Sequence, residues 1–413
     1  MKIAMLGFGN IGAGFYEEIS SNYRDIEVVR ALVRDIKKPR AIDSSKLTSD
    51  FNVILNDPSI EAMVDVTAGD ASVKFIIEAL KASKSVITAN KMAVSLAGAE
   101  FIDIAIEKGV NFYFEAAVGG GIPVINLFNE NVKPHRINKV IGILNGTTNY
   151  ILTRMTDDGL EFGEALKLAQ EKGFAEPDPT FDITGRDSAY KTTILKDLLY
   201  DYKCGAEDIY CQGIDKITKA DLAYAQSIGC RIKLVGYIIN SVSGLDIGVR
   251  PVFLSAGHPL AQVSNEFNAI YIEGSPIGEI MLYGRGAGAK PTTASLVADL
   301  LRLKRGEANV FNRAYGHSEL KKHSMPEDLK SQRNYFRFTV LDVPGVISKI
   351  TTIFEKYNIS ISSMKQDISS ANEPANVIFT THESKCSKIP RMIEEIKKNK
   401  FVISEPVWYK MGI

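Results

Sequence analysis

The sequence predicts an α/β protein with a doubly wound parallel sheet, followed by an α+β region and a small βαββαβ unit. Strand-like and helix-like patterns alternate over residues 1–130, as in a parallel sheet with crossover helices. The segment 131–284 mixes strands with long helices and lacks a second glycine fingerprint. A charged linker at 321–333 precedes the last unit, 334–413, and the helical pattern within 285–320 is expected to return to the first sheet.

Composition excludes several classes of protein. The 413 residues include 49 Lys+Arg and 49 Asp+Glu, so no charge excess favours a nucleic-acid or membrane partner. No apolar run approaches the roughly 18 residues of a membrane helix, and the apolar run at residue 1 is too short for a signal peptide. The four cysteines have no metal-ligand spacing, so we expect reduced thiols in a cytoplasmic protein.

The first element is a buried strand, Lys2–Leu6, which leads into a glycine-rich turn and a helix. The turn has the pattern G-x-G-x-x-G, whose glycines allow a tight turn, a close approach of a pyrophosphate and tight helix packing. A second strand pattern, 26–34, follows at the expected distance. We therefore predict a Rossmann-type NAD(P)-binding domain; the alternative is a purely structural turn. The predicted cofactor loop consists of Gly7, Phe8, Gly9, Asn10, Ile11 and Gly12.

The end of the second strand bears on the choice of cofactor. Arg34 ends this strand pattern, where an arginine accommodates the 2′-phosphate of NADP and an acid would hold the ribose of NAD. Asp35 follows at once, but Lys37, Lys38 and Arg40 add positive charge. The sequence favours NADP, with NAD as the open alternative.

Further strands and helices complete the first sheet. Strand patterns lie within 62–69, 85–91 and 111–123, and helices are expected over Ala71–Lys84 and Ala93–Lys108. Ligands of such sheets bind beyond the carboxyl ends of the strands. Thr67, Lys91 and Glu115 each follow a strand and are therefore candidate site residues. For the lysine, the alternative is a solvated loop position.

The segment 175–191, "AEPDPTFDITGRDSAYK", concentrates carboxylates in a kinked loop. Pro177 and Pro179 exclude a helix in its first half, and a helix is expected after Gly185. Asp187 and Lys191 then lie four residues apart on one helical face. A surface ion pair is the simpler interpretation of this spacing alone.

The remaining chain has no further catalytic pattern. Two strands within 232–255 should form a hairpin with a turn at Ser243–Gly244, in an open sheet that could pair with another subunit. His323 in the linker is expected to be solvated, and none of the five histidines has a catalytic context. From residue 334, Phe336, Phe338 and Val340 alternate as in a half-buried strand. The helix, strands and second helix that follow complete the βαββαβ order.

Five motifs occur in order: "GFGNIGAG", "TANKMA", "EAAVGGGIPVI", "GILNGTTNYIL" and "EKGFAEPDPTFDITGRDSAYK". With these, the chain resembles monofunctional homoserine dehydrogenases from residue 1 to about 310, and the last unit resembles an ACT domain. The resemblance implies reversible NAD(P)-dependent interconversion of L-homoserine and L-aspartate 4-semialdehyde, in threonine, methionine and isoleucine biosynthesis. Two departures are small: Asn10 stands where threonine is common, and "ITGRDSAYK" replaces a more frequent "VEGLDAAHK".

The resemblance also implies roles for individual residues. An acidic cluster would hold the ammonium group of the substrate, and a lysine would exchange its hydroxyl proton. The implied catalytic residues are Lys191, Lys91 and Asp187, and the implied substrate-binding residues are Glu176, Asp182, Asp187 and Lys91. The resemblance further implies cofactor contacts at Gly173 and near Gly286, and a sodium site at Glu115, Val118, Gly120 and Ile122. Arg34, Thr67 and Lys91, predicted from their places at strand ends, complete the expected cofactor set.

The ACT resemblance implies an amino-acid effector, L-threonine, bound near Gly345 between paired modules of a homodimer or homotetramer. The alternative for this unit is a ferredoxin-like cap without a ligand. For the whole chain, two alternatives stay open. One is another NADP-dependent dehydrogenase of amino-acid semialdehydes, and the other is a non-catalytic sensor of amino acids and nucleotides.

Overall fold

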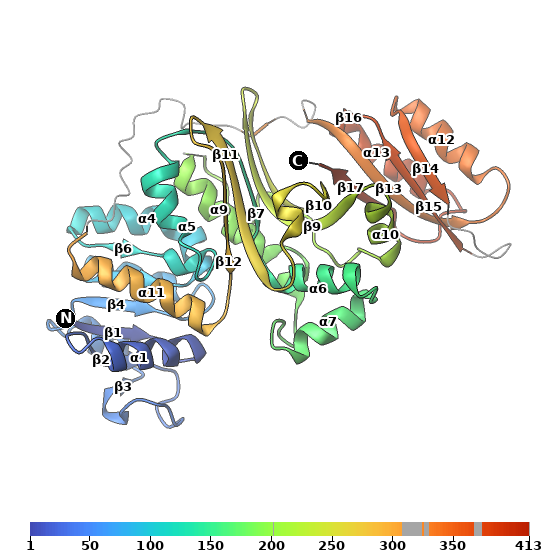
Figure 1. Cartoon of the computed structure of the whole chain (residues 1–413). Coiled ribbons are helices and arrows are strands. Elements are labelled where there is room, and N and C mark those ends of the chain that lie inside the picture. Colours follow the sequence, from blue (N-terminus) through green and yellow to red (C-terminus); the bar gives the residue numbers. More distant parts are fainter. Residues whose placement is uncertain (201, 308–323, 326–329, 367–373, 413) are drawn as a thin grey trace.

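Figure 1 shows the fold, a computed structural model, as three parts that follow one another along the chain. The structure describes residues 1–200, 202–307, 324–325, 330–366 and 374–412. The predicted fold class is confirmed: a parallel sheet comes first, a mixed sheet with helices second and a βαββαβ unit last. Within the described residues, no helix has the length and apolar content needed to cross a membrane.

The first sheet is parallel throughout and has the strand order β3-β2-β1-β4-β5-β6. Strands β1, β4, β5 and β6 are buried on both faces, which explains their largely apolar sequences. Side chains of β1 alternate between two cores: Ile3 and Met5 pack on one side, and Ala4 and Leu6 on the other. The strands are β1 Lys2–Leu6, β2 Glu27–Leu32, β3 Leu47–Thr48, β4 Ala62–Asp65, β5 Ser85–Thr88 and β6 Phe112–Tyr113.

Helices cover both faces of this sheet. Two helices lie on one side, and one of them is the late helix α11, whose Leu296 and Leu300 join the core around Phe15 of α1. These two helices are α1 Asn10–Asn22 and α11 Ala289–Lys304. On the other side lie α2 Phe51–Leu55, α3 Ser72–Lys81 and α4 Lys91–Lys108.

Two predicted boundaries in this part are wrong by two residues. Strand β2 ends at Leu32, so Arg34 lies just beyond it and is exposed. Helix α4 begins at Lys91, because the Asn90 side chain accepts hydrogen bonds from the N–H groups of Met92 and Ala93 and so caps the helix earlier. Lys91 therefore belongs to the first helical turn and not to a loop.

The second sheet has the order β12-β11-β7-β9-β10-β17-β13-β15-β14. Three helices cover one face of its first half, with an apolar core that includes Leu234 and Ile238 of β9. The strands are β7 Arg136–Ile143, β9 Cys230–Ser241, β10 Gly244–Ser255, β11 Phe267–Ser275 and β12 Gly278–Arg285. The helices are α6 Gly146–Asp157, α9 Arg186–Leu199 and α10 Lys219–Ser227; α7 Phe162–Glu171 packs on α6.

The β9–β10 hairpin differs from expectation in two ways. Its turn is Val242–Ser243, one residue earlier than predicted. The hairpin also lies inside the sheet: β9 pairs with β7, and the other edge of β10 is covered by β8 (Tyr210–Cys211) and β17. The edges of this hairpin are thus covered by this chain's own strands, and pairing of the sheet with another subunit stays a prediction.

The C-terminal unit confirms the βαββαβ order and adds a short strand, β16. Phe336, Phe338 and Val340 form its core with Ile350 and Phe354. Its elements are β13 Ser331–Leu341, α12 Val346–Lys356, β14 Ile361–Gln366, β15 Pro374–Thr381, β16 Ser384–Lys385, α13 Ile389–Lys397 and β17 Val407–Met411. Of the expected linker, 321–323 (with His323) and 326–329 lie outside the described residues, and β13 begins three residues before the predicted boundary.

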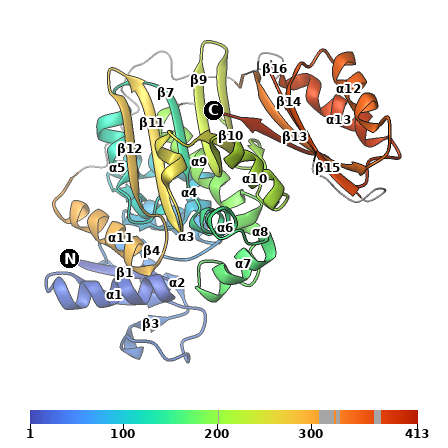
Figure 2. The ribbon, with the colours of Figure 1, turned by 45° about the vertical axis from the view of Figure 1, so that its right-hand side comes forward.

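The prediction that β13 is half-buried is wrong. Tyr335 and Arg337, on its second face, are also buried because they pack against α10 of the preceding part. Strand β17 joins the two halves: Lys410 is paired with Val252 of β10, and Tyr409 with Tyr335. The strands of the ACT-like unit therefore continue the middle sheet, and the unit is not joined to it by a linker alone (Figure 2).

Candidate active site

The carboxylate-rich loop contains a short helix that was not expected. Residues 175–179 are non-helical, but Thr180–Ile183 form one helical turn, α8, so the exclusion of a helix before Gly185 was too broad. Proline is compatible with a position just before a helix, and the Asp178 side chain accepts the N–H of Thr180 there. Gly185, with φ +85°, then turns the chain into α9, as predicted.

Asp187 lies between the two predicted catalytic lysines. Its Oδ1 is 2.9 Å from Nζ of Lys91, and its Oδ2 is 2.7 Å from Nζ of Lys191. Lys191 also donates to the carbonyl oxygen of Leu144 at 2.7 Å. Asp187 and Lys191 are buried, whereas 35% of the Lys91 side chain is exposed. The simpler interpretation, a surface ion pair, is therefore excluded by burial.

Asn145 connects the two aspartates and was not singled out from the sequence. Its Nδ2 donates to Asp182 at 2.7 Å and to Asp187 at 2.9 Å, while its Oδ1 accepts the N–H of Thr148 and caps α6. The available signal was the pattern Asn-Gly-Thr-Thr before a helix, which is typical of an N-cap. The two further bonds depend on tertiary packing.

The two aspartates occupy different electrostatic environments. Burial works against ionisation of Asp187, but Lys191 and Lys91 outweigh it and hold its pKa below the ordinary value. Burial and the negative charge of Asp187 raise the pKa of Asp182. Asp187 raises the pKa of Lys91. The site thus contains one firmly ionised carboxylate and one that takes up a proton more readily.

Glu176 lies at the edge of this cluster. It is exposed, and its charge adds to the raised pKa of Lys91 after the larger effects of Asp187 and Asp182. The Lys91 ammonium also lies over the ring of Phe181, 5.7 Å from its centre. The structure therefore places Glu176 near the cluster without a direct bond to it among the described residues.

The glycine-rich turn has the shape that a pyrophosphate requires. Gly7 has φ +97°, which other residues rarely adopt, and a side chain at Gly12 would press on the Gly7 carbonyl at 3.1 Å. A side chain at Gly9, the N-cap of α1, would meet nothing within 4 Å, so the space in front of the helix start is open. Thr67 lies against Gly7, with its hydroxyl bonded to Asp65. The free N–H groups of this helix start suit an anion.

Two predicted cofactor glycines have a structural explanation of their own. Gly173 ends α7 with φ +73°, the conformation that glycine favours after a helix. Gly286 is buried, and an added Cβ would lie 1.9 Å from Nδ2 of Asn268. Whether either contacts a cofactor stays a prediction.

Glu115 is a buried carboxylate at the end of β6. Its oxygens accept the N–H groups of Ile125 at 2.8 Å and Asn126 at 2.9 Å. Its own N–H donates to Asp299. Burial raises the pKa of Glu115 to about 7 and that of Asp299 to about 8. Two acids are thus buried side by side with little compensating charge.

The loop after Glu115 has an irregular backbone, and some of its carbonyl oxygens accept hydrogen bonds. Gly120 has φ +55°, and its carbonyl oxygen accepts the Ser295 hydroxyl at 2.6 Å. The carbonyl of Ile122 accepts the N–H of Val124, and Val118 is fully buried. Each carbonyl keeps a second lone pair. Within the described part of the chain, no group of three His, Cys, Asp or Glu could hold a metal, so a cation here would depend on backbone oxygens.

Comparison with known proteins decides the family. A protein described as homoserine dehydrogenase from Bacillus subtilis is 35% identical over 399 residues, which cover 93% of this chain and 92% of that protein. One from Synechocystis sp. is 35% identical over 418 residues, covering 96% of each chain. The chain belongs to the homoserine dehydrogenase family. Its members are NAD(P)-dependent oxidoreductases, so the predicted enzyme class is confirmed.

Family models agree with this assignment part by part. "Homoserine dehydrogenase, NAD binding domain" matches residues 7–115, "Homoserine dehydrogenase" matches 123–301 and "ACT domain" matches 335–401. The crystal structure of a homoserine dehydrogenase from Thiobacillus denitrificans has a TM-score of 0.88 at 32% identity and covers 100% of this chain and 98% of that one. The S. aureus homoserine dehydrogenase at pH 7.5 has a TM-score of 0.76 at 32% identity, covering 100% and 99%. The sensor and the other semialdehyde dehydrogenases are not favoured.

Proposed function

We propose that Lys191 transfers the proton of the homoserine dehydrogenase reaction and that Asp187 holds it in position. The supporting observation is the placement of the Lys191 ammonium, which is buried between Asp187 and the carbonyl of Leu144, each 2.7 Å away. An ammonium with two acceptors keeps its third N–H for a ligand. A positioned proton donor of this kind is typical of general acid–base catalysis.

The reaction explains why such a group is needed. Oxidation of the L-homoserine hydroxyl to an aldehyde removes a hydride and a proton, and reduction of L-aspartate 4-semialdehyde returns both. A bound nicotinamide cofactor supplies or accepts the hydride. In reduction, Lys191 donates its proton to the developing alkoxide; in oxidation, its neutral form accepts the hydroxyl proton. Asp187, 2.7 Å from the Lys191 ammonium, holds it in position for this transfer.

We infer that Asp182 and Glu176 bind the substrate ammonium. Oδ1 of Asp182 accepts one N–H of Asn145, which leaves its other oxygen for a second cation. Glu176 is exposed at the edge of the same cluster. The partial exposure of Lys91 supports a contact of this lysine with the substrate and the cofactor. Carboxylates that fix the ammonium also fix the distance from the hydroxyl to Lys191.

We infer a preference for NADP, with NAD as the alternative. Arg34 is exposed just beyond β2, whereas Arg40 is engaged by the carbonyls of Asp35 and Lys38. A solved archaeal homoserine dehydrogenase, described as a complex with NADPH, has a TM-score of 0.64 at 25% identity over 75% of this chain and 98% of that one. The exposed guanidinium supports a 2′-phosphate contact at Arg34, and the NADPH bound to that relative supports NADP as the cofactor.

We also infer a sodium site at Glu115, Val118, Gly120 and Ile122. The oxygen-only donors of the irregular loop suit a hard cation, and a cation would compensate the buried Glu115 and Asp299 carboxylates. Such an ion would stiffen the loop that packs against Gly286, since a side chain at Gly120 would lie 2.6 Å from that carbonyl. Its role would be structural.

For the ACT domain we infer L-threonine as the effector. ACT domains commonly bind amino acids, and Gly345 with φ +89° opens α12 at the expected turn. The N–H groups at the start of a helix suit a carboxylate. Capture between paired modules would require a homodimer or homotetramer. We also propose that the enzyme contributes to threonine and methionine biosynthesis.

The reaction is tested by recording the absorbance of reduced cofactor with L-homoserine and each of NADP⁺ and NAD⁺. We expect reduction only when L-homoserine is present and not with L-serine, which is one methylene shorter. Binding of both cofactors without any turnover would favour the sensor. Turnover with another amino-acid alcohol, but not with L-homoserine, would favour a different dehydrogenase on the same scaffold.

A further inference from the structure

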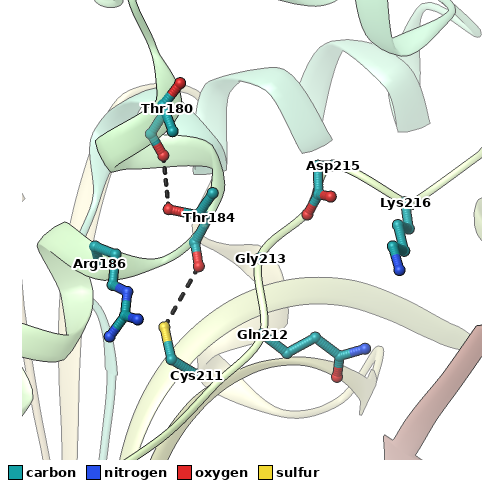
Figure 3. A pocket seen from close by; sticks show the side chains of 8 residues that line it. All are labelled: Thr180, Thr184, Arg186, Cys211, Gln212, Gly213, Asp215 and Lys216. Carbon is teal, nitrogen blue, oxygen red and sulfur yellow. Dashed lines mark hydrogen bonds between the residues drawn. The ribbon is translucent and has the colours of Figure 1, made fainter. Parts of the chain in front are cut away.

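A pocket lies beside α8, and its lining includes none of the residues of the acidic cluster (Figure 3). We call it the junction pocket. Its volume is about 520 Å³, within the range that holds small ligands. One wall is α8 with the start of α9, and the other is the segment Cys211–Lys216, which leads from β8 towards α10.

The side chains that line the junction pocket suit a zwitterion. Arg186 and Lys216 offer positive charge and Asp215 negative charge, and Thr180 and Thr184 add hydroxyls. Among the described residues that line it, none is aromatic or branched aliphatic. This chemistry fits the carboxylate and ammonium of an α-amino acid with a small polar side chain. It does not fit a nucleotide base or a large apolar side chain.

Arg186 has an ion pair at the rim but is not saturated. It lies 2.7 Å from Glu207, whose side chain is 66% exposed, so water competes for this pair. A guanidinium has five N–H donors and can hold a second carboxylate.

The junction pocket shares the helix α8 with the active site. Thr180 and Thr184 are four residues apart and face the junction pocket, whereas Asp182, between them, bonds to Asn145 on the substrate side. A movement of this single turn therefore changes the position of Asp182.

The opposite wall holds α8 directly. The N–H of Ile214 donates to the carbonyl of Ile183 at 2.8 Å, and Cys211 Sγ lies 3.4 Å from the carbonyl of Thr184. Gly213 packs so closely that an added Cβ would lie 2.1 Å from the Ile183 oxygen.

The same wall contacts the ACT domain. Gln212 donates to the carbonyl of Trp408 at 2.9 Å, and Arg337 donates to the carbonyl of Lys216 at 2.9 Å. The junction pocket is thus bounded by a segment that contacts both the ACT sheet and the substrate loop. An occupant would therefore affect both contacts.

We propose that the junction pocket binds a small polar α-amino acid and that its occupant changes the affinity for L-homoserine by shifting α8. The binding site is separate from the ACT effector site near Gly345. Only the effect on substrate affinity rests on the proposed role of Asp182.

The test is calorimetric titration of the full-length protein with glycine, L-serine and L-threonine in turn, with the active site saturated by L-homoserine and no cofactor present. We expect at least one to bind, and Arg186→Gln and Asp215→Asn each to weaken that binding about tenfold or more. Arg231→Gln is the matched control: this arginine pairs with Asp157 at 3.1 Å with a similarly exposed side chain, outside the junction pocket. The site would be overturned if none of the three amino acids binds, or if both pocket variants bind as tightly as the wild type.

A second measurement locates the ligand. Alkylation of Cys211 with iodoacetamide, followed by peptide mass spectrometry, should slow when the amino acid is bound, while Cys230 reacts at an unchanged rate. Unprotected Cys211 would overturn the location. The KM for L-homoserine should shift in the wild type and not in Arg186→Gln. Binding without a KM shift would refute the coupling through α8 alone, and a protein without turnover would refute the proposed function while leaving the titration valid.

Discussion

The hydroxyl of Tyr335, in the ACT domain, donates a 2.5 Å hydrogen bond to Oδ1 of Asp221, in the first turn of α10. Both residues are fully buried, and Arg337 donates to the same oxygen at 2.8 Å. A buried carboxylate of the middle part is therefore satisfied in part by the ACT domain. Separating the two would give up both hydrogen bonds to this oxygen, including the ion pair with Arg337.

Tyr335→Phe should lower the free energy of unfolding by about 1–3 kcal/mol, because it removes a donor from a buried charged acceptor. Urea denaturation followed by circular dichroism measures this. Tyr357→Phe, in the same domain, is the control, since its hydroxyl bonds Glu395 at the surface. Equal stability of Tyr335→Phe and wild type would mean that this contact does not hold the domain in place.

Threonine inhibition is best tested on the intact chain, because removal of the ACT domain would also strip Asp221 of Tyr335 and Arg337. Gly345→Asp should abolish inhibition by L-threonine, since a fixed negative charge repels the ligand carboxylate at the start of α12. Gly345→Asn, with the same shape and no charge, should retain more sensitivity. Steady-state rates across a threonine series decide this, and a wild type indifferent to threonine removes this effector.

Lys191→Ala should lower kcat by about 10²–10⁴-fold, the usual contribution of a positioned acid–base group. Cofactor binding, followed by fluorescence, should be nearly unchanged. Lys84→Ala is the control: Lys84 is also buried, but its ammonium binds the carbonyls of Asp57 and Ile60 in the first domain. If Lys191→Ala keeps most of the wild-type turnover, another group must transfer the proton.

The affinity for L-homoserine should rise with pH through the acidic range. Burial raises the pKa of Asp182 above its ordinary 3.8, and a bound ammonium would lower it again. Between the pKa of the free enzyme and that of the complex, binding of the substrate therefore releases a proton from Asp182. The KM for L-homoserine should fall by up to about tenfold per pH unit there. Asp182→Asn should flatten this profile, whereas Asp178→Asn, an exposed acid of the same loop, should keep it. A slope that survives in Asp182→Asn would contradict this assignment.

Arg34→Ala should raise the KM for NADP much more than the KM for NAD, because only NADP offers a phosphate to the guanidinium. Arg24→Ala is the control, as this exposed arginine lies before β2 and away from its carboxyl end. Initial rates with both cofactors measure the effect. An equal increase for the two would show that Arg34 does not select the phosphate.

Local patterns predicted the first domain well because its signals are short-range. Residues close in sequence were enough to predict that β1 is buried on both faces. They also predicted the positive φ of Gly7 and the close packing at Gly12. The i,i+4 spacing likewise predicted the Asp187–Lys191 contact. The placement of Lys91 beside Asp187 came from family resemblance, since 96 residues separate them in the chain.

The features that were not predicted depend on contacts between residues that are distant in sequence. Asn145 bonds to residues 37 and 42 positions away, and no local pattern indicates this. The second buried face of β13 results from α10, and Tyr335 and Arg337 look like ordinary surface residues until α10 is placed against them. The one turn of α8 after Pro179 was missed because proline was taken to exclude a helix that it only precedes.

The position of β17 has a consequence for the synthesis of the protein on the ribosome. This strand comes last in the sequence order of the sheet, yet it lies between β10 and β13, which leave the ribosome before it. During translation both strands therefore have an unpaired edge on the side that β17 will fill. Unpaired edges favour association between nascent chains. We expect newly made chains to be most prone to aggregation in the interval before residues 407–411 emerge, and a fusion placed directly after β17 to obstruct the closing step of the sheet.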